Sequence, residues 1–184
     1  LEPPIFNLSY DQYENIDINS KIVGIYRKIY PELNQKFQIK QKNQKIRIGF
    51  ISEFFSNHTI GKLFKGIIFN LSDEKFEKFV FHSHKTDISP IYQEFLNAEK
   101  KTNIKNITLS KNFQKSVNEI IQENLDIVFF PDIGMSSEFY YLSFIRFAKI
   151  QITSWGHPIT TSNDTIDYFL SSKLLETKDA HKRF

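Results

Sequence analysis

The stretch DIVFFPDIGMSSEFYYLSFIRFAKIQITSWGHPITTSNDTIDY, residues 126–168, decides the fold of this chain. It opens on a short apolar run closed by Pro131, Asp132 and Gly134, which is typical of a strand covered on both faces. A serine-capped helix is predicted next, and residues 149–155 predict a second strand that a Gly-His-Pro sequence ends. In an open parallel sheet, ligands bind at the carboxyl ends of the strands. We therefore expect the functional site to lie where these strands end.

Strand and helix patterns also alternate along the rest of the chain. Apolar residues recur at helical spacing in three further segments, residues 60–71, 90–96 and 113–121. Short apolar segments around them predict strands at residues 46–52, 79–82, 104–109 and 165–170. This alternation predicts an α/β, Rossmann-like fold, in which a mostly parallel sheet has right-handed crossovers and helices on both faces.

The first quarter of the chain differs from the rest. Apolar residues recur at helical spacing between residues 18 and 29, which predicts a helix that ends before Pro31. Residues 34–45 are rich in Gln, Lys and Asn and are the best linker candidate. We therefore expect an N-terminal helical arm and linker at residues 1–44, and one Rossmann-like lobe at residues 45–184.

Composition indicates a soluble globular protein with one main domain. The chain has 184 residues, of which 40% are hydrophobic and 24% charged. Its net charge of +3 comes from scattered residues, which argues against a basic nucleic-acid face. The chain has no cysteine and no run approaching the roughly 20 apolar residues of a membrane span, so we expect no disulfide, no membrane span and a cytoplasmic location. It begins at Leu1 and ends at Phe184, so we expect a fragment of a longer protein.

Several motifs carry a resemblance to a known family. They are PDIGM at residues 131–135, RFAKIQ at 146–151, WGHPITT at 155–161 running into IDYF at 166–169, and RIGFISEFFSNHTIGKLFKGII at 47–68. This ordered set closely resembles the catalytic region of bacterial relatives of O-linked N-acetylglucosamine transferase, a family (glycosyltransferase family 41) that includes SPINDLY-type proteins. The resemblance covers most of the chain but only the first half of the family's catalytic region.

The resemblance implies a fold and an activity. The fold would be the N-terminal lobe of a two-lobed GT-B glycosyltransferase. The family transfers a sugar, typically N-acetylglucosamine from its UDP conjugate, to Ser or Thr of proteins, with inversion and without a metal or other cofactor. In relatives, a C-terminal lobe makes most contacts to the sugar nucleotide, and helical (TPR) repeats precede the catalytic region. We therefore expect a protein acceptor and a sugar nucleotide as partners, and an inactive isolated fragment.

His58, in the loop after the first predicted strand of the lobe, is the candidate catalytic residue. A histidine at this edge can hydrogen-bond a phosphate or a reacting hydroxyl, and Asn57 and Thr59 beside it are candidate substrate contacts. The other interpretation is that this loop only caps the following helix. The resemblance favours function, because a His here lies beside the sugar nucleotide in relatives. Animal relatives carry an Asp four residues earlier, where this chain has Phe54, next to Glu53.

The second candidate group lies around the later strand. Gly156 permits close approach of the backbone to a ligand, and the resemblance places Trp155 and Gly156 near the donor sugar. His157 follows them, but animal relatives have Tyr there, so we do not expect it to be the catalytic base. Thr160 could donate to a phosphate or sugar, or be a solvated loop residue. The resemblance associates Gln151 with the acceptor, and a buried Gln that satisfies backbone groups explains it equally well.

Other chemistries find little support in the sequence. Gly49 and Gly61 are too isolated to form a Gly-rich phosphate loop. His82 and His84 share a strand face but have no acidic or Cys partner at metal-ligand spacing, so we expect no metal site. Asp132 could bind a hydroxyl or merely cap a turn. The rival to the enzyme is a non-catalytic α/β protein-interaction module, and within the enzyme class a relative that transfers fucose or glucose, or modifies Asn.

Overall fold

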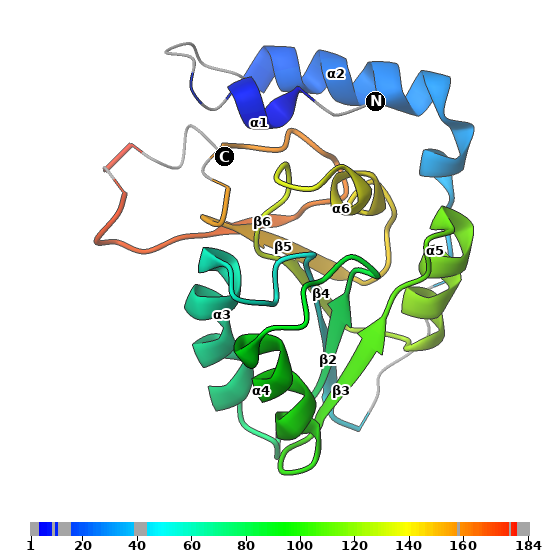
Figure 1. Ribbon diagram of the computed structural model, residues 1–184. Coiled ribbons are helices and arrows are strands. Elements are labelled where there is room, and N and C mark those ends of the chain that lie inside the picture. The colour runs from blue at the N-terminus through cyan, green and yellow to red at the C-terminus, as the bar shows by residue number, and fades with distance from the viewer. Residues whose placement is uncertain are drawn as a thin grey trace.

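A sheet of parallel strands forms the centre of the molecule (Figure 1). The computed structural model describes residues 4–8, 10, 16–38, 44–157, 159–176 and 178–179. Within these residues, the sheet has six strands in the order β3-β2-β1-β4-β5-β6, and every neighbouring pair is parallel. The strands are β1 (Ile46–Ile51), β2 (Phe76–His82), β3 (Ile104–Thr108), β4 (Ile127–Phe130), β5 (Ile150–Ser154) and β6 (Tyr168–Leu170). The predicted α/β Rossmann-like fold is confirmed.

Helices cover both faces of this sheet (Figure 1). They are α1 (Ile5–Leu8), α2 (Ile16–Ile29), the 3₁₀ helix η1 (Pro31–Asn34), α3 (Thr59–Asn70), α4 (Pro90–Glu99), α5 (Phe113–Gln122) and α6 (Ser137–Leu142). The apolar side chains of α3 and α4 join one core cluster, and those of α2, α5 and α6 join another. No helix in the described ranges is long and apolar enough to cross a membrane.

The two core clusters follow from the alternation of side chains along each strand. Phe50 of β1, Val80 of β2 and Phe129 of β4 face α3 and α4. Their neighbours Phe81 and Phe130 face the opposite layer. Because strands buried on both faces are apolar throughout, the continuous apolar runs of the sequence identified these strands correctly.

Helix α2 packs on the lobe through Val23 and Tyr26, and Asn19 is also buried. Tyr26 lies edge-on to Tyr140, Tyr141 and Phe144, with ring centroids 5.4 to 6.5 Å apart. The predicted helix is therefore present, and of its predicted apolar positions Tyr26 is buried and Ile22 packs against the core. Ile25 and Ile29 are 53% and 57% exposed, whereas Tyr26 is buried.

The strand order creates a topological switch point between β1 and β4. These strands are adjacent, with Phe50 opposite Phe129. The chain leaves β1 through α3 and β4 through α6, and these helices pack on opposite faces. The loops therefore diverge where β1 and β4 end, which is where parallel sheets bind ligands.

Candidate functional site

A buried carboxyl group lies at the switch point. Ser52, directly after β1, donates its hydroxyl to Oδ2 of Asp132, directly after β4, at 2.9 Å. Both side chains are buried. The N–H of Phe54 donates to the Ser52 hydroxyl at 3.0 Å, which fixes the hydroxyl between the two loops. The loops that follow β1 and β4 are thus joined through one Ser–Asp hydrogen bond.

Burial controls the proton affinity of this carboxyl group. Loss of water contact is the main reason that the pKa of Asp132 is raised to about 7. The negative charge of Glu53 adds to this rise, and the Ser52 hydrogen bond opposes it. At neutral pH the group therefore exchanges a proton readily. A carboxyl group with a pKa near the working pH is suited to general acid–base catalysis.

A second acid–hydroxyl pair lies beside the first. Ser136 donates its hydroxyl to Oε2 of Glu53 at 2.5 Å. Ser136 occupies the N-cap position of α6, as predicted, but its side chain does not cap the helix. The hydroxyl of Thr86, after β2, donates to the carbonyl of Glu53 at 2.9 Å, so the loops after β1, β2 and β4 are tied together.

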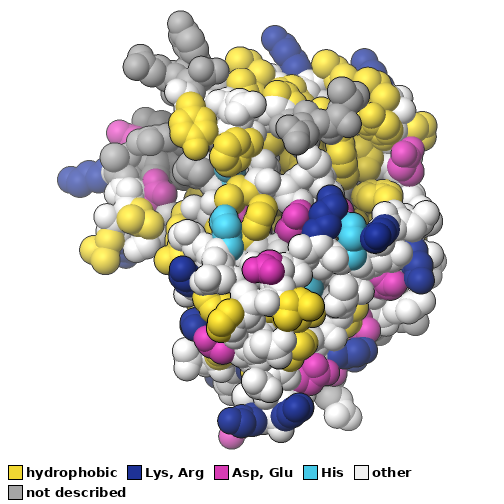
Figure 2. All heavy atoms as spheres, in the orientation of Figure 1, with side chains coloured by type: hydrophobic (Ala, Val, Ile, Leu, Met, Phe, Trp, Pro, Cys, Tyr) yellow, Lys and Arg dark blue, Asp and Glu magenta, His cyan; other side chains and the backbone are white. Residues whose placement is uncertain are grey.

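A third acidic side chain, Glu138 of α6, also pairs with a serine hydroxyl. Ser83 donates to Oε2 of Glu138 at 3.3 Å, and Nδ1 of His84 lies 3.7 Å from the same oxygen. Burial raises the pKa of Glu138, against the opposing effects of His84, Lys85 and Ser83. Figure 2 shows histidine and acidic side chains near the middle of this face, above the region of α3 and α4. In the described part of the chain, no three His, Asp or Glu side chains group as metal ligands would.

His58 lies at the mouth of this edge and caps helix α3. Its Nδ1 accepts a hydrogen bond from the N–H of Ile60 at 3.2 Å, and its ring stacks on Phe54 at 4.5 Å. Burial and, secondarily, the charge of Lys62 lower the pKa of His58, so the ring is neutral at pH 7. Because Nδ1 accepts, the proton of the neutral ring lies on Nε2, which is free to donate to a ligand. The capping interpretation and a role in binding are therefore compatible.

Asn57 and Thr59 flank His58 and are both exposed. The N–H of Asn57 donates to the hydroxyl of Ser89 at 2.8 Å, which ties this loop to the start of α4. Thr59 is the first residue of α3. Both side chains are therefore accessible to a ligand at the edge of the site.

The loop after β5 packs on helix α3. The ring of Trp155 packs on Phe64 of α3, with centroids 5.5 Å apart. A Cβ atom on Gly156 would lie 2.3 Å from the carbonyl oxygen of Pro131, so only glycine permits this approach of the two loops. The structure thus brings Trp155 and Gly156 together with the loops that follow β1 and β4.

His157 is a buried residue of the loop after β5. It is 3% exposed, and its ring lies 5.7 Å from that of Phe6 and next to Gly134. Burial lowers the pKa of His157 to about 4, while the backbone of Phe6 favours the charged form. The residue therefore joins α1 to the loop after β4 as a neutral ring.

Gln151 and Thr160 are placed apart from the switch point. Gln151 is fully buried near the amino end of β5, where its amide bonds the backbone of Phe147, Ile145 and Thr165 at 2.7 to 3.2 Å. Of the two interpretations of this residue, its geometry matches the buried Gln that satisfies backbone groups. The carbonyl of Thr160 accepts from Asn19 at 2.9 Å, and its hydroxyl accepts from the N–H of Ser162.

Sequence reasoning missed the acid–hydroxyl network. It left open whether Asp132 binds a hydroxyl or caps a turn, and it selected neither the Ser52 hydroxyl nor the Glu53–Ser136 and Glu138–Ser83 pairs. The available signal was position along the chain. Ser52, Glu53, Ser83 and Asp132 come directly after strands, and Ser136 and Glu138 lie at the start of α6. The missing information was that β1 and β4 are neighbours, because residues 80 or more apart pair only through that order.

Comparisons with known proteins place this fold. No model of a protein family matches the sequence, and no curated protein does. Among solved structures, a mutant of the Thermobaculum terrenum O-GlcNAc transferase is similar, with a TM-score of 0.72 and 13% sequence identity. The match covers 90% of this chain but only 32% of that protein. The chain therefore has the α/β Rossmann-like fold of one lobe of a GT-B glycosyltransferase, as the resemblance implied.

Proposed function

We propose that this chain is the N-terminal lobe of an inverting protein glycosyltransferase. The observation that carries the proposal is the fold it shares with part of an O-GlcNAc transferase, at a TM-score of 0.72. Two features of the site support it: the switch point holds a titratable carboxyl group, and His58 presents a hydrogen-bond donor beside it. The donor we propose is UDP-N-acetylglucosamine, and the acceptor a Ser or Thr hydroxyl of a protein.

Asp132 is the residue we assign to proton transfer. In an inverting reaction the acceptor oxygen forms a bond to the anomeric carbon as the bond from that carbon to the diphosphate oxygen breaks. The acceptor loses its proton, and a carboxyl group with a pKa of about 7 is able to take it. The charge of Glu53 adds to the effect of burial on this pKa. Glu53 precedes Phe54, which stands where animal relatives have an Asp.

His58 is assigned to the leaving group. Its Nε2 donor lies at the start of α3, a helix of 12 residues whose first N–H groups carry partial positive charge. Negative charge develops on the diphosphate as it leaves, and preorganised donors stabilise such charge. His58 therefore acts as a neutral donor in this proposal and not as a base. Trp155 and Gly156 form the wall nearest the sugar.

The proposal includes parts beyond these residues. We propose that a C-terminal lobe supplies most contacts to the sugar nucleotide, that helical repeats precede the lobe, and that the protein acts in the cytoplasm without a metal cofactor. The 184 residues alone would then transfer no sugar, because they provide one wall of the cleft. Transfer of fucose or glucose, or modification of Asn, fits this lobe equally well.

The test uses the natural full-length polypeptide that contains this sequence. It is incubated with UDP- and GDP-sugars and a protein lysate, and released nucleotide and modified protein are measured by mass spectrometry. Asp132→Asn and His58→Ala should both impair transfer, while Glu74→Gln, an exposed acid at the opposite edge of the sheet, should not. Undiminished transfer by Asp132→Asn contradicts its role, and absence of any transfer contradicts the enzyme.

The second candidate function is a non-catalytic interaction module. Large apolar side chains on the surface favour it, among them Leu174 and Leu175, which are 96% and 64% exposed. This candidate predicts that no sugar nucleotide is consumed by the full-length protein, whereas substitution of these leucines by Ser abolishes association with a partner.

A further inference from the structure

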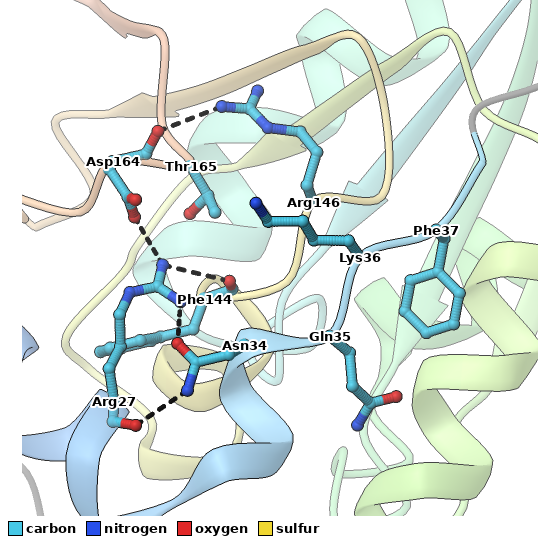
Figure 3. Close-up of a pocket in the computed structure, with 9 residues that line it drawn as sticks. All are labelled: Arg27, Asn34, Gln35, Lys36, Phe37, Phe144, Arg146, Asp164 and Thr165. Atoms are coloured by element: carbon cyan, nitrogen blue, oxygen red, sulfur yellow. Dashed lines mark hydrogen bonds and ion pairs between the residues drawn. The ribbon is translucent and has the colours of Figure 1, made fainter.

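A hollow of about 490 Å³ lies at the opposite edge of the sheet from the candidate site (Figure 3). Its walls come from the end of α2, the segment after η1, and the turns before β5 and β6. The volume is in the range of small-molecule pockets. None of the residues assigned to glycosyl transfer lines this hollow.

Three cationic side chains from separate segments line the hollow: Arg27, Lys36 and Arg146. Lys36 is exposed, and Figure 3 shows its side chain pointing between those of Arg27 and Arg146. Among the described residues, no carboxylate forms an ion pair with the Lys36 ammonium. The only acidic side chain among the described lining residues is Asp164.

The two arginines are held in place by the fold. Arg27 pairs with Asp164 at 2.5 Å, donates to the carbonyl of Leu33 at 2.9 Å and lies over the Phe144 ring. Arg146 pairs with Asp167 at 2.6 Å and donates to the carbonyl of Asp164 at 3.1 Å. A guanidinium has five N–H donors, so Arg146 keeps donors for a ligand. The amino groups of Arg27 also donate to Asn34, Phe144 and Asn163, so Arg27 offers a ligand only its charge and its buried Nε. The donors for a ligand therefore come mainly from Lys36 and Arg146.

We propose that this hollow binds the phosphate group of a small phosphorylated molecule. A phosphate carries close to two negative charges and presents oxygens in several directions, so it can meet cations from three sides. A carboxylate presents two oxygens in one plane and matches a single arginine, as Asp164 and Asp167 already do here. The site is separate from the switch point, so its ligand is not the sugar donor of the proposed reaction.

Calorimetric titration of the full-length polypeptide with pyrophosphate tests this site. We expect one saturable site in addition to any binding at the switch point. Lys36→Gln should weaken it about 5-fold or more, as loss of one partly exposed charge contact would. The matched control is Lys21→Gln, an exposed lysine of α2 away from the hollow. Asp164→Asn should tighten binding, because it removes the competing carboxylate.

Further variants show whether pyrophosphate binds in the hollow or at the switch point. His58→Ala must leave this affinity unchanged, and Lys36→Glu must abolish it while the melting temperature stays that of the parent. Equal weakening by Lys36→Gln and Lys21→Gln, or no effect of either, overturns the site. Loss of this binding in His58→Ala moves it to the switch point and overturns the proposal. Citrate binding as tightly as pyrophosphate overturns the assignment to phosphate.

Discussion

Acidic side chains have different partners at the two edges of the sheet. At the amino edge, where the strands begin, carboxylates pair with lysine or arginine at 2.6 to 3.3 Å: Lys78–Asp73, Lys105–Glu123, Arg47–Glu123 and Arg146–Asp167. At the carboxyl edge, Glu53, Asp132 and Glu138 receive hydrogen bonds from serine hydroxyls instead. In the described part of the chain, no lysine or arginine forms an ion pair with any of these three.

The two kinds of partner have different effects on the free energy of folding. Paired charges stabilise a fold modestly, whereas a buried carboxylate without a cation costs free energy and shifts its pKa. Proteins keep such unfavourable groups mainly at functional sites. The carboxyl edge of this sheet therefore holds its acids in a less favourable setting than the amino edge does, as the proposed function requires.

The largest expected effect is on catalysis by Asp132→Asn in the full-length polypeptide. If Asp132 accepts the proton, turnover should fall about 10²- to 10⁴-fold while donor affinity changes little, because an amide cannot take a proton. Turnover and Michaelis constant are measured separately. A change confined to the Michaelis constant would show that Asp132 only binds substrate.

The same variant should have the opposite effect on stability. The pKa of Asp132 is about 7 when folded and near 3.8 when unfolded, so between these values the folded state binds more protons. This group therefore makes the parent lose about 1.4 kcal/mol of stability per unit as the pH rises through that window. Asp132→Asn should be more stable than the parent at pH 8, with the gain shrinking toward pH 4. Urea unfolding at both pH values checks this, and a gain that does not depend on pH would contradict it.

Two glycines of helix α3 test how tightly the carboxyl edge is assembled. A Cβ on Gly61 would lie 2.3 Å from the backbone oxygen of Ser56, so Gly61→Ala should destabilise the protein by about 1–3 kcal/mol. Gly66 has open space around it, and Gly66→Ala should stabilise by about 1 kcal/mol through helix propensity. Thermal unfolding compares the two. Equal effects would mean that the loop after β1 moves to make room for the methyl group added at position 61.

One acid from each edge sharpens the contrast. Asp167→Asn should destabilise by about 1 kcal/mol, because it removes the charge that pairs with Arg146, and the loss should shrink in high salt. Glu53→Gln should be neutral or stabilising at pH 8, because it removes a charge that raises the pKa of Asp132. Urea unfolding at two salt concentrations measures both. Destabilisation by both variants to the same extent would erase the distinction between the edges.

A further prediction concerns the buried histidines, His82 of β2 and His157 after β5. Burial lowers the pKa of His82 and of His157 to about 4, so both rings should stay neutral from pH 8 down to about pH 5. Since an unfolded histidine titrates near 6.5, these two groups destabilise the protein as the pH falls from 6.5 toward 4. NMR titration of the ring protons gives the midpoints. A midpoint near 6.5 for either ring would show that water reaches it.

Strand positions could be predicted because burial on both faces leaves a direct pattern in the sequence. Residues 46–52 and 126–130 were identified from their apolar runs and form β1 and β4. The residues of the site were harder to predict from local sequence patterns. His58 could be selected because one loop contains it, whereas the Ser52–Asp132 pair depends on which strands are neighbours. Gln151 looked like a site residue because its motif is distinctive, but its partners are backbone groups that no local pattern reveals.

Gln151 also has a mechanical role in the lobe. Its amide fastens the amino end of β5 to two turns, and the chain then continues four residues, or about 13 Å, to Trp155. Strand β5 thus has its amino end fixed by Gln151 at one edge of the sheet, and the loop that contains Trp155 follows its carboxyl end at the other edge. A shorter side chain at position 151 would lose these bonds, so the position of Trp155 in the proposed site depends on contacts made at the far edge of the sheet.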